Sequence, residues 1–240
     1  MPRITALIAN YNGAPFLARA LQSVRAQRLP PDGYEIVVVD DGSTDESWRL
    51  VEPEAPHLRL LRLSHRGLPA ACNAGIQQAR GDYLIRLDAD DEFEPDLLAE
   101  GAAVLDRAPG VALVTTDRST VEEATGQVGL VRVDPANVYE YIAPGVMFRT
   151  RALIDVGLYD QLYWEEYDLF IRLLKRYRAH HIAAPLYRYY RHERSMTAPA
   201  IDRWNGWQAL IRKWGMEELR RFGSCEELEA VAIDLHGSAR

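Results

Sequence analysis

Residues 83–95 read YLIRLDADDEFEP, and the other motifs of the chain gain their meaning from this stretch. Its first five residues are mostly apolar and predict a buried strand, which breaks directly into Asp88, Asp90, Asp91 and Glu92. Four carboxylates within five residues repel one another, so a fold keeps them together when a positive charge compensates them. Divalent cations such as Mg²⁺ prefer such oxygen ligands, completed by substrate phosphates.

The spacing of these carboxylates predicts different roles for them. In an extended segment, Asp88 and Asp90 point to one face and Asp91 to the other. One carboxylate then takes a metal ion, while its neighbour accepts a hydrogen bond from a sugar or ribose hydroxyl. The alternative for an isolated cluster is a solvated acidic turn before a helix that begins near Pro95, but the rest of the chain favours the metal.

Composition excludes several classes of protein. A chain of 240 residues suits one large α/β domain, or one domain with a small appendage. Its apolar content of 48% and charged content of 26% are typical of a soluble globular protein. The formal net charge of -7 argues against nucleic acid as a partner, because clustered basic residues hold phosphate backbones.

The cysteines and the apolar runs indicate a compartment. Cys72 and Cys225 have neither the spacing of a metal site nor that of a disulfide framework, which fits a reducing environment. Residues 1–7 are too short and too polar for a signal peptide, and no apolar run approaches a membrane span. The sequence therefore predicts a cytoplasmic protein.

The first half of the chain alternates strand and helix patterns. Apolar runs predict strands at residues 4–9, 34–39, 58–63, 83–87 and 111–115, with helices at 14–27, 68–79 and 97–105. Ser43 and Glu46 predict a capping box that opens a further helix. Repeated strand–helix units predict the α/β class, with a doubly wound, mostly parallel sheet flanked by helices.

Three polar clusters follow predicted strands directly, at residues 10–12, 40–43 and 88–91. Ligands of doubly wound sheets bind beyond the carboxyl ends of the strands. We therefore expect the three clusters to converge on one rim of the sheet.

The second half has weaker patterns. Residues 116–137 are polar and turn-rich and predict irregular strands or a surface excursion. Further along, we expect a short strand at 145–148, helices at 151–156 and from about 165, and an edge strand at 186–192. Helices after residue 201 contain Trp204, Trp207 and Trp214, which we expect to pack onto the core, so that membrane contact is at most peripheral.

Four segments together resemble a known family: TALIANYNGAPFLARALQSVRAQ (5–27), EIVVVDDGSTDES (35–47), GLPAACNAGIQQARGDYLIRLDADDEFEPDLL (67–98) and GVMFRTRALIDVGLYDQLYWEEYDLFIRL (145–173). They look like an inverting family 2 glycosyltransferase of the GT-A type, with motifs in the family's order from Ile4 to about Thr197. Processive relatives carry membrane spans and a QxxRW motif. This chain keeps only Arg203-Trp204 of that motif, so the resemblance is to a non-processive enzyme.

The resemblance implies a division of the chain and a set of partners. A GT-A-like domain would cover residues 1–199, with a nucleotide-binding half to about 115 and an acceptor half over 116–199. A C-terminal helical extension would cover residues 200–240. The implied donor is a nucleoside-diphosphate sugar, most readily of the UDP type. The implied acceptor is a glycan or a lipid-linked acceptor, and the cofactor is Mg²⁺ or Mn²⁺.

The resemblance also assigns nucleotide-sugar-binding residues. Tyr11 matches the aromatic residue that stacks on the base, with Ala9 on the same strand, and Asp41 matches the carboxylate that accepts N3–H of uracil. Arg66 could contact phosphate. Taken alone, Tyr11 also suits a half-buried core aromatic, Asp41 a turn acid near a helix N-terminus, and Arg66 a solvated loop residue.

Asp88-Ala89-Asp90 resembles the family's DxD motif. By that match, Asp90 ligates the metal that bridges the diphosphate, while Asp88 and Ala89 contact the ribose or the sugar. His192 resembles a position near the diphosphate or the metal, although a lone His at a strand end is more often structural.

An inverting transferase needs one base that deprotonates the acceptor hydroxyl. The family places this base second in an ED pair at a helix start, so Glu166 is the candidate. Glu165, turned by about 100° round the helix, is expected to point away from the acceptor. The alternative for both is favourable acid at a helix N-terminus. Asp168 is expected to pair with Arg172 on the helix surface.

Two departures from the family pattern leave alternatives open. Glu166 stands where relatives have Asp, and Cys72 stands where they commonly carry Arg. The first alternative is therefore a degenerate member that binds a nucleotide sugar or a glycan without turnover. The second is a nucleotidyltransferase, although residues 10–15 lack the basic loop that would activate a triphosphate.

Overall fold

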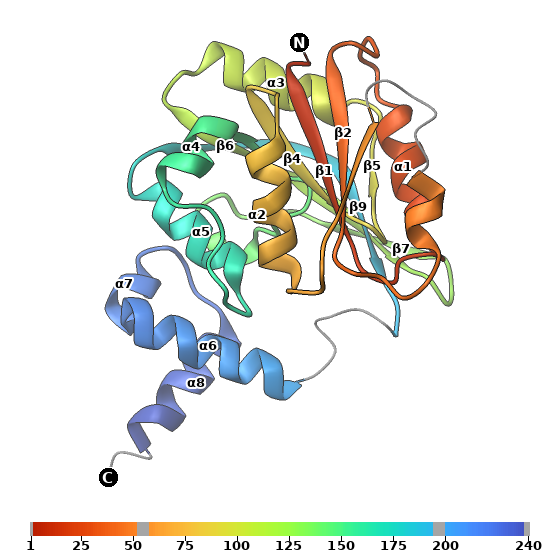
Figure 1. Cartoon of the computed structure of the whole chain (residues 1–240). Helices are drawn as coiled ribbons and strands as arrows, with labels where there is room; N and C mark the ends of the chain where they lie inside the picture. Colours follow the sequence, from red (N-terminus) through yellow and green to blue (C-terminus); the bar gives the residue numbers. More distant parts are fainter. Residues whose placement is uncertain (1, 52–57, 194–199, 238–240) are drawn as a thin grey trace.

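The computed structural model describes residues 2–51, 58–193 and 200–237 (Figure 1). The strands are β1 (Ile4–Asn10), β2 (Tyr34–Asp40), β3 (Leu58–Arg62), β4 (Tyr83–Asp88), β5 (Glu92–Phe93), β6 (Val111–Glu122), β7 (Gln127–Val131), β8 (Met147–Arg149) and β9 (Arg178–Arg191). The helices are α1 (Leu17–Arg25), α2 (Leu68–Gln78), α3 (Leu97–Arg107), α4 (Thr150–Asp155), α5 (Glu165–Leu174), α6 (Ala200–Trp214), α7 (Met216–Arg220) and α8 (Glu226–Gly237), with short 3-10 helices η1 (Ser47–Val51) and η2 (Val138–Glu140). The predicted α/β class is confirmed.

A single sheet joins these strands in the order β3-β2-β1-β4-β8-β6-β9-β5, and β7 pairs with the outer part of β6. The strands β3, β2, β1 and β4 are parallel, as the strand–helix alternation predicts. Beyond β4 the sheet is mixed, because β8 runs antiparallel to both β4 and β6, while β9 is parallel to β6. The parallel half and the mixed half therefore meet between β4 and β8.

Helices cover both faces of the parallel strands, which explains their continuous apolar sequence. Leu7 and Val37 pack with α2 and α5 in one hydrophobic cluster, whereas Ile8 and Val38 pack with α1 and α3 in the other. In Figure 1, α2 lies across the front of β1 and β4.

The prediction of an edge strand at residues 186–192 is wrong. β9 is a long strand that lies between β6 and β5 and pairs with β6 along most of its length. The prediction for residues 116–137 also needs correction, because β6 continues to Glu122 and β7 returns beside it. The residues of β7 are almost all exposed, and those of β9 are mostly exposed or half-buried. Polar residues in both strands therefore obscure the apolar pattern that marks a strand.

The predicted helix after Ser43 does not form. The Ser43 Oγ accepts the backbone N–H of Asn12 at 2.9 Å, so it serves the turn after β1 instead of a capping box. The Asp45 carboxylate likewise accepts the backbone N–H of Ala14 at 3.0 Å. Only η1 follows, because these side chains hold the segment as a turn against the neighbouring strand.

Of the C-terminal helices, α6 lies beside α5, and α8 lies on the other side of α6 (Figure 1). Trp207 is 2% exposed, and its ring stacks on Tyr167 with centroids 5.3 Å apart, which confirms the predicted packing of this tryptophan. The predicted boundary at residue 199 lies outside the described residues, so the division of the chain stays a prediction. Among the described helices, none combines the length and the apolar character that a bilayer span requires.

Asp168 explains how α6 is held on α5. The predicted ion pair with Arg172 forms at 2.8 Å, but Asp168 is fully buried and does not lie on the helix surface. Its second oxygen accepts the indole N–H of Trp214 at 2.8 Å and lies 2.6 Å from Nζ of Lys213. Because Lys213 and Trp214 belong to α6, one buried carboxylate fixes the two helices against each other.

We expect Asp168→Ala to lower the free energy of unfolding by about 3 kcal/mol or more, because Arg172 would stay buried without its carboxylate. Urea denaturation followed by circular dichroism measures this change. Glu217→Ala is the matched control, since its carboxylate is 93% exposed beside Arg221. Equal unfolding midpoints for the two variants would contradict the role of Asp168.

Candidate active site

The ends of β1, β2 and β4 bring the three polar clusters together. Asn10 pairs in register with Asp40, and Ala9 pairs with Asp88. The Asn10 amide also donates to the Asp40 carboxylate at 3.1 Å. The predicted convergence on one rim of the sheet is confirmed.

Tyr11 and Asp41 form one side of this rim. Tyr11 is 49% exposed, and its ring stacks on His65 with centroids 4.1 Å apart, so Tyr11 is not a core aromatic. Asp41 is 3% exposed and accepts the backbone N–H groups of Arg66 at 2.9 Å and Gly67 at 2.8 Å. The Arg66 side chain is exposed. Asp41 therefore holds the loop after β3 beside an open pair of stacked rings.

Glycine at position 42 is required by this loop. Gly42 has φ +76°, and a Cβ there would lie 2.7 Å from the backbone nitrogen of His65. Any other residue would combine backbone strain with a clash against the main chain. The turn after β2 and the loop after β3 are thereby closed against each other.

The acidic turn after β4 forms a compact group. Carboxylate oxygens of Asp88, Asp90 and Asp91 lie within 4.8 Å of one another. The expected extended segment, with Asp91 on the opposite face, is wrong because the chain turns and the Asp91 N–H donates to the Asp88 carbonyl at 3.1 Å. Burial and repulsion from Asp88 raise the pKa of Asp90. Carboxylates held together against their own repulsion fit a hard divalent cation.

Asp91 also ties this turn to β9. It is 1% exposed, and its two oxygens accept the Tyr187 hydroxyl at 2.6 Å and the Tyr190 backbone N–H at 2.7 Å. Burial, followed by repulsion from Asp90, raises the pKa of Asp91 well above its usual value. Sequence reasoning gives Asp91 no such partner, because the bonded residues lie almost a hundred positions away.

The two predicted metal residues are neighbours. The His192 Nε2 lies 2.8 Å from a carboxylate oxygen of Asp90, and the imidazole stacks on Phe16 with centroids 4.6 Å apart. The Asp90 side chain is 30% exposed, whereas that of His192 is 9% exposed. The pair therefore presents an accessible carboxylate oriented by a packed imidazole.

Arg86 connects the acidic turn to α5, a role that sequence reasoning missed. It is 3% exposed, and its guanidinium lies 2.8 Å from the Asp88 carboxylate and 3.1 Å from the Glu165 carboxylate. The available signal was a charge inside the apolar run YLIRL, because a buried guanidinium needs a partner. One cation thus joins the two groups of acidic residues.

Glu165 and Glu166 lie at the N-terminus of α5. Glu165 is 4% exposed and lies 3.1 Å from the Arg86 guanidinium, and the expectation that it points away from an acceptor stays a prediction. Burial and the charge of Glu165 raise the pKa of Glu166 well above its usual value. Burial also raises the pKa of Glu165, but the charge of Arg86 opposes this rise. Glu166 is therefore the carboxyl group of the pair that more readily holds a proton.

Cys72 lies beneath this pair and takes no part in an open site. It is fully buried, and burial raises the pKa of its thiol to about 12, so the group is neutral. The next residue, Asn73, holds the backbone of Tyr159 through hydrogen bonds of 2.8 and 2.9 Å. Position 72 is therefore part of the packing around Arg86.

Comparisons of the sequence with known proteins agree with these features. Residues 5–196 match the family model described as Glycosyl transferase family 2. The chain is 36% identical over 98 residues to the putative glycosyltransferase EpsH of Bacillus subtilis, which covers 40% of this chain and 28% of EpsH. It is 26% identical over 172 residues to poly(ribitol-phosphate) beta-N-acetylglucosaminyltransferase TarS of Staphylococcus aureus, covering 66% of this chain and 30% of TarS. This chain thus spans less than a third of either relative.

Solved structures share the fold. TarS residues 1–349 in complex with UDP-GlcNAc superpose with a TM-score of 0.73 at 21% identity, covering 92% of this chain and 71% of that chain. The mannosyltransferase PcManGT from Pyrobaculum calidifontis, in complex with GDP-Man and Mn²⁺, gives a TM-score of 0.68 at 21% identity, covering 99% and 75%. The GT-A-like fold is confirmed, and since the family model matches most of its length, the chain belongs to glycosyl transferase family 2.

Proposed function

We propose that this protein is a metal-dependent inverting glycosyltransferase that moves one sugar from a nucleoside-diphosphate sugar to an acceptor hydroxyl. The observation that carries the proposal is the Arg86 bridge, which sets the Asp88–Asp91 turn beside the carboxyl pair of Glu165 and Glu166. A cation site for a diphosphate and a protonatable carboxyl group then lie on either side of one guanidinium. Related structures that hold UDP-GlcNAc and GDP-Man with Mn²⁺ support this class of donor.

The donor would lie across the ends of β1, β2 and β4. The exposed Tyr11 ring offers a stacking surface for the base, and the small side chains of Ala9 and Ala89 leave room for the nucleotide. The Asp41 carboxylate accepts the backbone N–H groups of Arg66 and Gly67 and contacts the His65 imidazole, which uses three hydrogen-bond acceptor positions. Its two oxygens offer about four such positions. One position remains for the N3–H of a uracil ring, which supports a UDP-type donor.

The diphosphate would meet the acidic turn. Asp90, with His192 behind it and with Asp88 and Asp91 close by, supplies the oxygen-rich set that Mg²⁺ or Mn²⁺ prefers. Bound there, the cation would neutralise charge that develops on the leaving nucleoside diphosphate. In this arrangement Asp88 stays paired with Arg86 through both oxygens, and its remaining acceptor positions would take a ribose or sugar hydroxyl.

Glu166 would act as the base. Burial and the charge of Glu165 favour its protonated form, so it would become competent once it has released this proton to solvent. Ionised Glu166 then takes the proton of the acceptor hydroxyl as this oxygen attacks the anomeric carbon. A single base and a direct attack invert the anomeric centre.

We further propose the division into a nucleotide-binding half over residues 1–115, an acceptor half over 116–199 and an extension over 200–240. It is supported by the parallel half of the sheet, which supplies Tyr11, Asp41 and Asp90, whereas Glu166 lies on α5. A glycan or lipid-linked acceptor would approach from the second half.

For the metal, we expect Mn²⁺ to strengthen UDP binding to the parent protein and Asp90→Asn to abolish this strengthening, because the accessible carboxylate oxygen is lost. Isothermal titration with Mn²⁺ and with EDTA measures both affinities. Asp96→Asn is the control, since its exposed carboxylate pairs with Arg28 in front of α3. A parent protein that binds UDP equally well with EDTA would rule out the metal site.

For the base, we expect Glu166→Gln to reduce turnover by about two to four orders of magnitude, the usual contribution of a positioned general base. Donor affinity and unfolding midpoint should stay unchanged, because the carboxylate is needed only when the acceptor attacks. Glu100→Gln, on the exposed side of α3, serves as the control. Proton NMR of the product should show an inverted anomeric centre. Unimpaired turnover of Glu166→Gln would remove this residue from the mechanism.

For the pH dependence, we expect kcat/KM of the parent protein to rise with pH through an apparent pKa above the usual Glu value of about 4.3. Burial and the Glu165 charge favour the protonated, inactive form of Glu166 at low pH. Glu165→Gln removes that charge and leaves Arg86 to stabilise ionised Glu166, so the rise should move to lower pH. A rise that stays in place or moves upward would contradict the coupling.

A further inference from the structure

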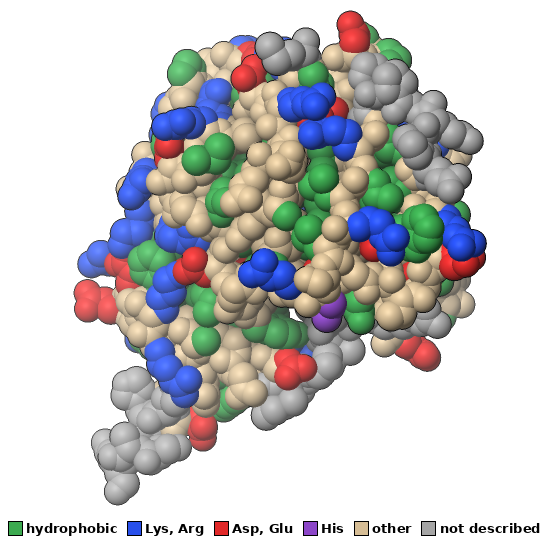
Figure 2. All heavy atoms as spheres, in the orientation of Figure 1, with side chains coloured by type: hydrophobic (Ala, Val, Ile, Leu, Met, Phe, Trp, Pro, Cys, Tyr) green, Lys and Arg blue, Asp and Glu red, His purple; other side chains and the backbone are tan. Residues whose placement is uncertain are grey.

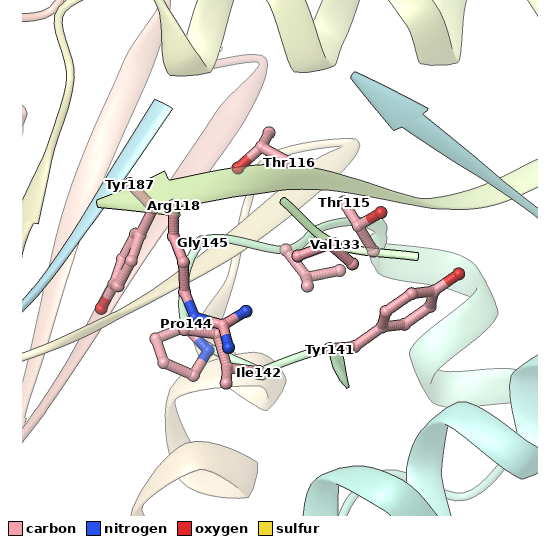
Figure 3. A pocket seen from close by; sticks show the side chains of 10 residues that line it. Thr115, Thr116, Arg118, Val133, Tyr141, Ile142, Pro144, Gly145 and Tyr187 are labelled. Atoms are coloured by element: carbon pink, nitrogen blue, oxygen red, sulfur yellow. The ribbon is translucent and has the colours of Figure 1, made fainter. Parts of the chain in front are cut away.

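Arg118 lines a small pocket between the mixed half of the sheet and the segment that leads into β8. It lies on β6 opposite Tyr187 of β9. Figure 3 shows its guanidinium beside Pro144 and Ile142, with Tyr187 on one side and Tyr141 on the other. The free space of the pocket is about 10 Å³, too small for a sugar ring or a whole phosphate group, so only one oxygen atom of a ligand fits beside the guanidinium.

Arg118 forms no ion pair with a carboxylate of the described residues. Its one side-chain hydrogen bond there goes from Nη1 to the carbonyl of Glu140 at 2.9 Å, and the Glu140 charge acts on it only from beyond ion-pair distance. The Glu140 carboxylate instead accepts the Asp134 backbone N–H at 2.8 Å. Arg86, by contrast, contacts two carboxylates.

Burial makes this missing counterion costly. Arg118 is half-buried, and burial lowers its pKa, yet a guanidinium keeps its charge at neutral pH. A partly buried cation whose remaining N–H groups face a pocket is stabilised when an anion enters. The forked N–H groups match the oxygens of a phosphate or a carboxylate.

The walls of the pocket reach the candidate active site in two places. Tyr187 donates its hydroxyl to Asp91, and the Gly145 N–H donates to the carbonyl of Arg86 at 2.8 Å. Tyr187 packs so closely on Gly145 that a Cβ there would lie 2.6 Å from the ring. On the other side, the Tyr141 ring meets Phe170 of α5 with centroids 5.7 Å apart. The pocket therefore lies between the acidic turn and the helix that holds Glu166.

The topology of the sheet indicates which substrate supplies the anion. The candidate nucleotide residues follow β1, β2 and β4, and β8 separates β4 from β6. An anion at Arg118 would therefore lie beyond the acidic turn as seen from the base-stacking Tyr11. This is the acceptor side of the site.

We propose that Arg118 binds an anionic group of the acceptor, a phosphate or a carboxylate, so that the acceptor is an anionic glycan. The assignment to an acceptor rests on the proposed function. Arg118 then selects and orients the acceptor, while Glu166 receives its proton. A neutral glycan would leave the Arg118 charge without a partner in the complex.

The test uses inorganic phosphate as the probe. Thermal unfolding midpoints are measured over a range of phosphate concentrations at constant ionic strength, once without nucleotide and once with UDP and Mg²⁺ saturating the donor site. We expect phosphate to raise the midpoint of the parent protein and of Arg191→Met, a control arginine that is exposed and paired with Glu122. In Arg118→Met the apparent phosphate affinity should fall by about 10- to 100-fold, the worth of a hydrogen bond to a charged group.

Arg118→Lys keeps the charge without the fork and should lie between the parent protein and Arg118→Met, which preserves the test if Arg118→Met folds poorly. No phosphate-dependent shift in the parent protein without nucleotide, or an equal shift in both Arg118 variants and the parent, would overturn the anion site. A shift that UDP abolishes would mean that Arg118 holds the donor diphosphate, and would overturn the assignment to the acceptor.

A separate measurement, the midpoint shift that UDP and Mg²⁺ cause without phosphate, tests the proposed function. UDP with Mg²⁺ should raise the midpoint without phosphate, and the absence of this shift would count against the donor site alone. An Arg118-dependent phosphate shift in the same protein would still support the anion site.

Discussion

A guanidinium inside a sheet strand constrains the candidate active site more than any other group. Arg86 is buried on β4, where an unpaired charge would be very costly, so the fold must bring carboxylates to it. Asp88 on the same strand and Glu165 on α5 form ion pairs with Arg86. The position of α5 relative to the acidic turn follows from this need, and Glu166 is carried with it. The ion pairs that compensate the buried charge of Arg86 therefore also fix the positions of the acidic turn and α5 relative to each other. On the face shown in Figure 2, the basic side chains are scattered among acidic ones and do not gather into one patch.

The parallel half of the fold could be predicted because its signals are local. Apolar runs placed β1, β2, β3 and β4 within a residue or two, and strand–helix alternation predicted that these strands are parallel. The mixed half could not be predicted in this way. Its longest strand, β9, alternates exposed and half-buried residues and finds its partners across the sheet, so no short apolar run marks it.

The candidate site divides along the same line. Asp90, His192 and Glu166 could be named from their motifs, and Asp90 and His192 do meet in the structure. Interactions between distant segments could not be predicted. Arg86 and Glu165 are separated by 79 positions in the sequence, and Asp91 and Tyr187 by 96. Such pairs are decided by packing, for which a single sequence offers no local pattern.

The stacked aromatic rings beside α6 have a practical consequence. Trp207 covers Tyr139, Trp164 and Tyr167, and all of these rings belong to the hydrophobic cluster that includes α5. A polypeptide shortened before α6 would expose this aromatic surface to water, and contiguous apolar patches of this kind promote aggregation. A shortened chain therefore needs to keep α6, because this helix covers the aromatic surface. It also holds α5, on which Glu166 lies, in place through Asp168.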